Sequence, residues 1–227
     1  MQLQNIEGVI FDLDGTLYNI RHMKLRISFM LLKSLKYLKN LFKARKSVRG
    51  AKHRDKEALL DYLYNELATN AGTSADDAKN WYLNTFMPAF VKLLKKKGVA
   101  RPGISDFLRE MRAKNIKLGV VSDFGHVKER LEAIGIDPGL FDTLKASEDF
   151  AVLKPSPLPV LGVAGEWDIP VEKIVMVGDR DDMDGECARN AGMFFLGISE
   201  KKVDDEKFFM WNEALSLLRV ATDLERI

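Results

Sequence analysis

Short apolar runs of strand length, set among helical patterns, are the feature that most constrains the fold of this 227-residue chain. Five such runs are predicted to be strands: residues 6–12, 116–122, 143–147, 173–178 and 194–198. Amphipathic patterns of helical period lie before or between the last four, at residues 104–114, 127–134, 156–166 and 185–191. Because strands that alternate with helices form parallel sheets covered on both faces, the sequence predicts an α/β fold with a Rossmann-like parallel sheet.

The stretch between the first and second predicted strands has a different pattern. It contains no strand-like run, and helical periodicity covers residues 25–42, 56–69, 75–83 and 87–97. A turn at residues 101–103 then restarts the α/β pattern. The sequence therefore predicts an α/β core made of residues 1–17 and 99–227, with an all-helical insert at residues 18–98.

The charge is distributed unevenly along the chain. The net charge is only +2, but residues 21–56 contain thirteen Lys or Arg and a single acidic residue, a net charge of +12. The rest of the chain, with 22 basic and 32 acidic residues, carries −10. A basic module of this kind indicates contact with something anionic, either the substrate or a larger partner.

The cysteine content and the N-terminus bear on the compartment. Cys187 is the sole cysteine, which excludes an intrachain disulfide and a zinc site built of several thiolates. The first sixteen residues lack the basic and then apolar pattern of a signal peptide, and no apolar run is long enough to span a bilayer. We therefore expect a reducing, cytoplasmic location.

Polar residues follow four of the predicted strands directly. Asp12 and Asp14 follow the first, Ser122 ends the second, Lys154 follows the third and Asp179 follows the fourth. The carboxyl ends of parallel strands meet at one edge of the sheet, where ligands bind. These side chains are therefore expected to converge in one crevice.

The combination of carboxylates and a lysine favours phosphoryl chemistry. Asp12 and Asp179 together offer the oxygen ligands that Mg²⁺ prefers. The cation and Lys154 would neutralise a phosphoryl group, so that an anionic carboxylate can approach it. Asp14, two residues beyond Asp12, points differently and is suited to act as an acid and then a base.

In order along the chain, the D-x-D-G-T, Ser, Lys and G-D-x-x-x-x-D motifs resemble those of the haloacid dehalogenase-like (HAD) superfamily of hydrolases. The resemblance covers the whole predicted core, and the insert stands where that superfamily has its helical cap of the first type. It implies a magnesium-dependent phosphatase acting on a small phosphomonoester. Asp12 would be the nucleophile that becomes an aspartyl-phosphate, and Asp14 the general acid and base.

The same resemblance assigns residues to the phosphate. The backbone of Gly15 and Thr16 would turn close to the phosphate and offer N–H donors, and the Ser122 hydroxyl would hydrogen-bond the phosphoryl oxygens. Asp123 stands where the family often has Asn. Its carboxylate would add negative charge beside the phosphate pocket unless a backbone hydrogen bond turns it away.

The metal site is implied in the same way. Mg²⁺ would be held by the carboxylates of Asp12 and Asp179 and by the backbone carbonyl of Asp14. Lys154 would pair with the nucleophile and the phosphate, and Asp184 would orient Lys154 or the water ligands of the metal.

Other readings of the sequence stay open. A phosphoglucomutase-like phosphotransferase shares all of these motifs, whereas a dehalogenase is disfavoured because that branch lacks the acid found here at Asp14. A third reading is a binding protein whose basic insert contacts nucleic acid or an anionic membrane. The basic helix predicted at residues 25–43 fits a solvated face, a substrate-capturing field or a membrane-surface helix.

Overall fold

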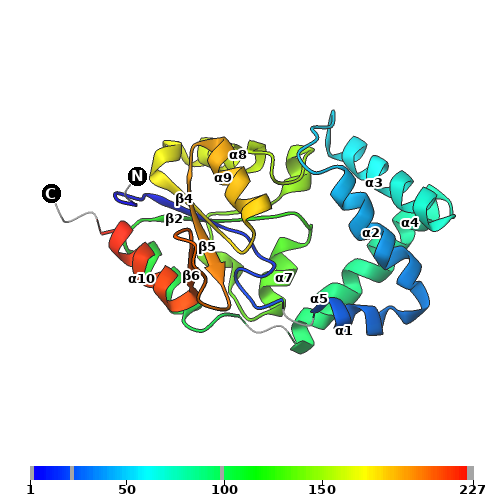
Figure 1. The fold of residues 1–227 in the computed structure, drawn as a ribbon, viewed down its shortest axis with the longest axis horizontal. Helices are drawn as coiled ribbons and strands as arrows, with labels where there is room; N and C mark the ends of the chain where they lie inside the picture. The colour runs from blue at the N-terminus through cyan, green and yellow to red at the C-terminus, as the bar shows by residue number, and fades with distance from the viewer. Residues whose placement is uncertain (1–2, 21–22, 98–99, 224–227) are drawn as a thin grey trace.

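The computed structural model describes residues 3–20, 23–97 and 100–223. Its centre is a parallel sheet (Figure 1). The sheet has six strands in the order β3-β2-β1-β4-β5-β6. The strands are β1 Gly8–Phe11, β2 Lys117–Ser122, β3 Thr143–Ala146, β4 Ile174–Gly178, β5 Phe194–Ser199 and β6 Phe208–Met210. Five of these lie at the predicted positions, so the predicted Rossmann-like α/β fold is confirmed.

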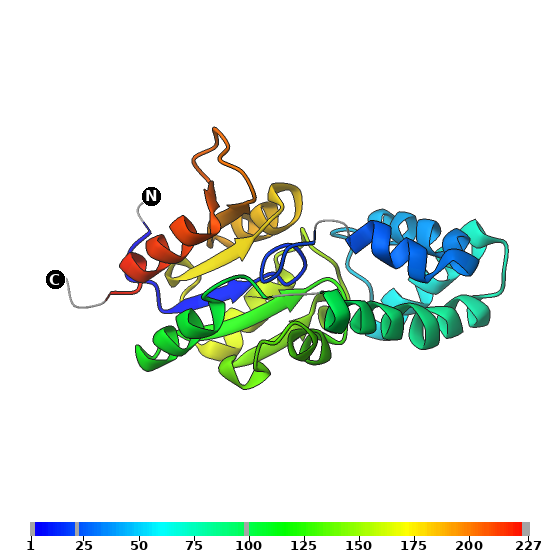
Figure 2. The same cartoon turned by 90° about the horizontal axis from the view of Figure 1, so that it is seen from below.

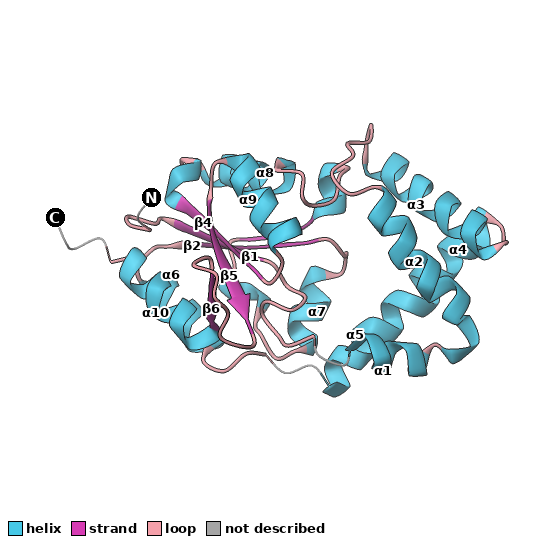
Figure 3. Ribbon diagram, viewed as in Figure 1, coloured by secondary structure: helices cyan, strands magenta, loops and turns pink. Residues whose placement is uncertain are grey.

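Both faces of the sheet are buried, because successive side chains of a strand point to opposite sides. On β1, Val9 and Phe11 pack in one core cluster and Ile10 packs in another. The first face is covered by α6 (Ile104–Ala113), α7 (Val127–Ala133) and α10 (Trp211–Ala221). The second is covered by α8 (Leu158–Trp167) and α9 (Glu186–Ala191), as Figure 3 shows.

The register aligns the strand ends that carry the predicted site. Phe11 of β1 is level with Val120 of β2 on one side and with Val177 of β4 on the other. Asp12 therefore leaves the sheet next to the last residues of both neighbouring strands. The central strands supply the polar groups at a single edge, where the strand order reverses around β1.

The predicted insert is helical and lies beyond that edge. Figure 2 shows β1, β2 and β4 pointing toward it. Its helices are α1 Met23–Met30, α2 Leu35–Ser47, α3 Lys56–Ala71, α4 Ala75–Trp81 and α5 Met87–Lys97. The predicted core boundary between residues 98 and 99 and the basic Arg21 lie outside the described residues. None of the described helices is long and apolar enough to cross a membrane.

The basic helix predicted from residue 25 to 43 is broken. A short 3₁₀ turn, η1 (Leu32–Ser34), separates α1 from α2. On either side of the break, α1 contacts α5 and α2 contacts α3. Ile27 of α1 and Leu38 and Leu41 of α2 are buried in the core cluster. A single straight helix would bury one continuous stripe of side chains, and that stripe could not contact both α5 and α3.

Candidate active site

Asp12 and Lys154 form the centre of the predicted site. The Lys154 ammonium lies 2.6 Å from Asp12 Oδ1 and 2.6 Å from Asp184 Oδ1. All three residues are buried, with 6%, 2% and 2% of their surface exposed. Lys154 also donates to the carbonyl of Val121, 3.3 Å away, so all its donor directions are used. A buried lysine between two carboxylates fixes the orientation of both.

In this cluster the carboxyl groups outnumber the single ammonium group. Burial raises the pKa of Asp12, and the neighbouring Asp184 and Asp179 oppose the lowering effect of Lys154. Burial would lower the pKa of Lys154, but Asp12 and Asp184 outweigh it, so its pKa is raised and it stays cationic. Three carboxylates face one ammonium. The excess negative charge therefore favours the binding of another cation.

Asp179 indicates where that cation would bind. Its Oδ1 is buried and has no hydrogen-bond partner in the described structure. Burial and the charge of Asp184 raise the pKa of Asp179 to about 7. Carboxylate oxygens of Asp12, Asp179 and Asp184 lie within 4.8 Å of one another. An orphaned oxygen in a set of hard donors fits Mg²⁺, so these residues satisfy the requirement for a divalent ion.

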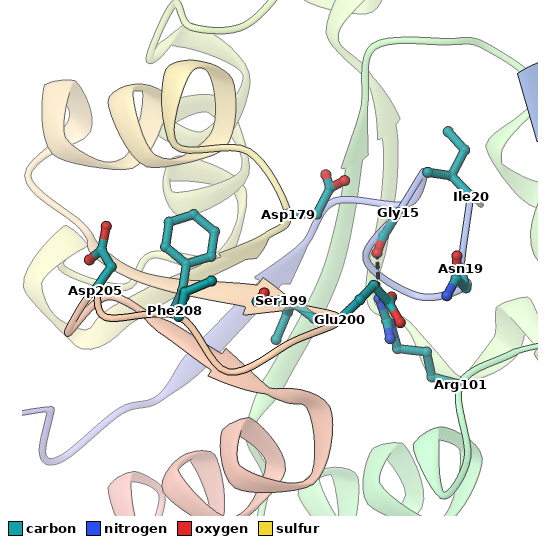
Figure 4. Close-up of a pocket in the computed structure, with 11 residues that line it drawn as sticks. Gly15, Asn19, Ile20, Arg101, Asp179, Ser199, Glu200, Asp205 and Phe208 are labelled. Atoms are coloured by element: carbon teal, nitrogen blue, oxygen red, sulfur yellow. Dashed lines mark hydrogen bonds and ion pairs between the residues drawn. The ribbon is translucent and has the colours of Figure 1, made fainter. Parts of the chain in front are cut away.

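Gly15 makes this arrangement possible. Its backbone lies in the left-handed region, with φ of +99°, which favours glycine. A β-carbon there would lie 2.1 Å from Asp179 Oδ2, far inside van der Waals contact. The glycine of the D-x-D-G-T motif therefore allows the Asp179 carboxylate to sit directly against the turn (Figure 4).

Asp14 lies close enough to Asp12 to raise its pKa, and the Asp14 carboxylate is engaged by side chains that the sequence motifs did not include. It accepts hydrogen bonds from the Arg130 guanidinium and the Tyr18 hydroxyl. The Ser122 hydroxyl lies 3.4 Å from Asp14 Oδ2 and 3.1 Å from Arg130 Nη1. Arg130 and Ser122 are fully buried. The structure thus brings Asp14 and Ser122 together, with Arg130 joining them.

Arg130 left one signal in the sequence. It lies on α7 between Val127 and Leu131, both buried, and so belongs to the apolar face of that helix. A charged residue on an apolar face needs a buried partner, and here the partner is Asp14. Tyr18 has no comparable signal in the sequence. Its hydroxyl reaches Asp14 because the chain turns back between these two residues.

Thr16 and Asp123 lie beside the centre, where their side chains already have protein partners. The Thr16 hydroxyl donates to Asp12 Oδ2 at 3.2 Å. The Asp123 carboxylate accepts the backbone N–H of Lys154 at 3.1 Å. The charge expected beside the phosphate pocket is thus turned toward the backbone.

The helical insert reaches the core through a second buried arginine. Arg45 of α2 pairs with Glu148 at 2.9 Å and lies over the ring of Phe124, 4.0 Å from its centroid. Arg45 also donates to the backbone carbonyl of Asp123. Phe90 of α5 lies against Phe124 and over Arg130. The insert therefore closes over the residues that follow β2.

A cavity of about 510 Å³ borders the site on the side of Asp179 (Figure 4). Arg101 forms part of its wall and donates to the carbonyls of Gly15 and Thr16, at 2.7 and 2.6 Å. It also pairs with Glu200 at 2.6 Å. Arg101 thereby ties the turn after β1 to the loop after β5. The cavity wall does not include Asp12 or Lys154.

Comparison with known proteins places this geometry in context. A family model described as haloacid dehalogenase-like hydrolase matches residues 9–198. A glyceraldehyde 3-phosphate phosphatase of Methanocaldococcus jannaschii is 29% identical over 212 residues, covering 88% of each chain. A phosphoglycolate phosphatase of Psychrobacter arcticus is 27% identical over 139 residues, 60% of each chain.

Solved structures show the same fold. The crystal structure of a 2-haloacid dehalogenase from Pseudomonas syringae superposes with a TM-score of 0.64 and 23% identity, covering 93% of this chain and 98% of the other. At that identity the likeness concerns the fold alone.

Proposed function

This chain belongs to the haloacid dehalogenase-like hydrolase family, and we propose that it is a phosphatase that cleaves small phosphomonoesters with the help of Mg²⁺ through a phosphorylated Asp12. The observation that carries the proposal is the buried cluster of Asp12, Lys154 and Asp184 next to the unpartnered oxygen of Asp179. A structural ion pair would need one carboxylate, and this cluster has a second and a third.

The proposed reaction uses two carboxylates, Asp12 and Asp14. An oxygen of Asp12 attacks phosphorus, and the bond from phosphorus to the substrate oxygen breaks. Asp14 gives a proton to the departing alkoxide. Asp14 then takes a proton from water, the water oxygen attacks the phosphorus of the aspartyl-phosphate, and inorganic phosphate leaves with Asp12 restored.

The remaining residues of the site position the two carboxylates and neutralise the charge of the phosphoryl group. Lys154 holds Asp12 and stays cationic, so it offsets the negative charge of the phosphoryl group. Mg²⁺, when held by Asp12, Asp179 and the Asp14 carbonyl, supplies further charge neutralisation. Arg130 and Tyr18 hold the Asp14 carboxylate beside Ser122.

The size of the substrate is inferred from the relatives. The two phosphatases described above are named for glyceraldehyde 3-phosphate and for phosphoglycolate. These are esters of short-chain carbon compounds. We therefore expect a phosphorylated metabolite of two or three carbons to be cleaved faster than sugar phosphates or nucleotides.

The test is phosphate release from a panel of phosphomonoesters that spans these classes. With Mg²⁺ present, the short-chain esters should be hydrolysed, and excess EDTA should abolish the activity. Ca²⁺ should inhibit, because it prefers more ligands and looser geometry than Mg²⁺. Full activity in EDTA would contradict the metal requirement, and an isomerised sugar phosphate without phosphate release would identify a phosphotransferase instead.

A further inference from the structure

The surface of the insert carries an unusual cluster of exposed apolar side chains. Of the fourteen large apolar side chains exposed in the described structure, six lie within residues 25–42. The most exposed of these are Leu25, Phe29 and Leu32, at 58%, 64% and 60%. Single exposed apolar residues are common, but a cluster of this kind indicates an interaction surface.

These side chains are the beginning of a longer stripe. Leu25 and Phe29 lie one turn apart on α1, and Leu32 follows in η1. Beyond that break, α2 exposes Lys36, Lys39 and Lys46 on the side opposite its buried leucines. The exposed stripe, as we call it, consists of Leu25, Phe29, Leu32, Lys36, Lys39 and Lys46. The stripe is apolar along α1 and η1 and basic along α2. The axes of α1 and α2 lie at an angle to each other (Figure 1).

The exposed stripe is not needed to hold the insert together. α1 contacts α5, and Ile27 on the side of α1 opposite Leu25 and Phe29 is buried. The stripe lysines also lack acidic partners within ion-pair distance among the described residues. By contrast, Lys56 and Lys173 each pair with a carboxylate, at 2.6 and 2.5 Å.

The charge around the exposed stripe is also positive. The neighbouring helix α5 exposes Lys92, Lys95 and Lys96. A second copy of the chain is a poor occupant of this surface, because two such stripes would bring lysines together. Nucleic acid would satisfy the lysines but would leave the leucines and the phenylalanine exposed. An anionic lipid surface offers phosphates above an apolar layer and so matches both halves.

We propose that the exposed stripe docks on an anionic membrane surface, with the apolar side chains of α1 entering the headgroup region and the lysines of α2 contacting lipid phosphates. The remaining sequence outside residues 21–56, with its net charge of −10, would be repelled by such a surface. Docking would therefore orient the molecule with the insert toward the lipid.

The experiment is co-sedimentation of the full chain with vesicles of phosphatidylcholine alone and of phosphatidylcholine mixed with phosphatidylserine. The chain should bind the mixed vesicles, and salt should weaken the binding. Two double variants test the two halves of the stripe, F29S/L32S and K36E/K39E. Each should weaken binding about tenfold or more, because apolar insertion and charge both contribute.

Matched controls lie in the α/β core, outside the insert. L217S/V220S removes exposed apolar side chains from α10, and K201E/K202E reverses two exposed lysines of the loop after β5. Both controls should bind as the parent does. Binding that ignores phosphatidylserine, or that falls equally in stripe and control variants, would overturn the proposal. Retention on heparin without binding to vesicles would overturn it too and would point to a soluble polyanion.

Discussion

Asp14 shows how a single side chain connects several parts of the site. Its carboxylate meets the Arg130 guanidinium, the Tyr18 hydroxyl and the Ser122 hydroxyl. Arg130 in turn lies under Phe90 of the insert, 5.0 Å from the ring centroid. Arg130 thus contacts both the carboxylate proposed to transfer protons and an aromatic ring of the insert.

We predict that Arg130→Met lowers kcat more than Arg45→Met does, although both remove a buried, ion-paired arginine. Of these two arginines, only Arg130 touches Asp14, so only its loss loosens the proposed acid. The defect should be about tenfold or more. It should be larger for an alkyl phosphate than for p-nitrophenyl phosphate, whose leaving group needs little protonation. Equal losses for both substrates, or for both variants, would mean that Arg130 has a structural role only.

Gly15 gives a second prediction. Gly15→Ala should raise the Mg²⁺ concentration needed for half-maximal activity by at least about tenfold, because the new methyl group collides with the Asp179 carboxylate. Gly135→Ala is the matched control. Its φ is +84° and nothing lies within 4 Å of the added carbon, so it carries the same backbone strain without the collision. An unchanged Mg²⁺ dependence in Gly15→Ala would contradict the placement of the metal beside Asp179.

The elements of the core could be predicted because their patterns are local. Strands such as β4 are continuous apolar runs, and helices such as α6 have a clear apolar face. β6 was missed because its three residues are too few for any period, and α10 follows it without a preceding turn signal. The break at η1 was missed because it is decided by packing against α3 and α5, and not by a proline or glycine.

The link between α2 and the core should be visible in stability measurements. Arg45→Met leaves the Glu148 carboxylate buried without its partner and should lower the free energy of unfolding by about 3–5 kcal/mol. Arg45→Met combined with Glu148→Leu should recover a large part of that loss, because no buried charge is then left unpaired. Denaturant unfolding of the two variants measures this coupling. Additive effects would show that the ion pair does not join the insert to the core.

At the scale of the whole molecule, stability should depend on pH and Mg²⁺ together. The pKa of Asp179 is raised from 3.8 to about 7, so ionising it opposes folding. Without metal, this group should make the protein less stable as the pH rises from about 4 to about 7. Mg²⁺ needs the ionised carboxylate, so it should stabilise the fold more at pH 8 than at pH 5.

Thermal unfolding with and without Mg²⁺ tests this expectation. At about a hundredfold excess over its Kd, Mg²⁺ should raise Tm by roughly 5–10 °C at pH 8. The rise should be much smaller at pH 5 and should be lost in Asp179→Asn. The same rise at both pH values would contradict the role given to Asp179.

The positions of Asp12, Lys154 and Asp179 at one edge could be predicted because strand ends of a parallel sheet meet there. The partners of Asp14 could not, since Tyr18 and Arg130 reach it from a turn and from a helix on different parts of the chain. Such contacts depend on how elements pack. The sequence places Arg130 on the apolar face of its helix, but it does not identify the partner.

Phosphate release by the parent chain and by Asp12→Asn, with Mg²⁺ present, tests the proposed role of Asp12 as the nucleophile. The amide is close in shape to the carboxylate, so the fold should remain, but it cannot form the aspartyl-phosphate and is a poor metal ligand. We predict hydrolysis by the parent and a loss of at least about a thousandfold in the variant, at an unchanged fold by circular dichroism. Activity of Asp12→Asn within tenfold of the parent would contradict the proposal that Asp12 is the nucleophile.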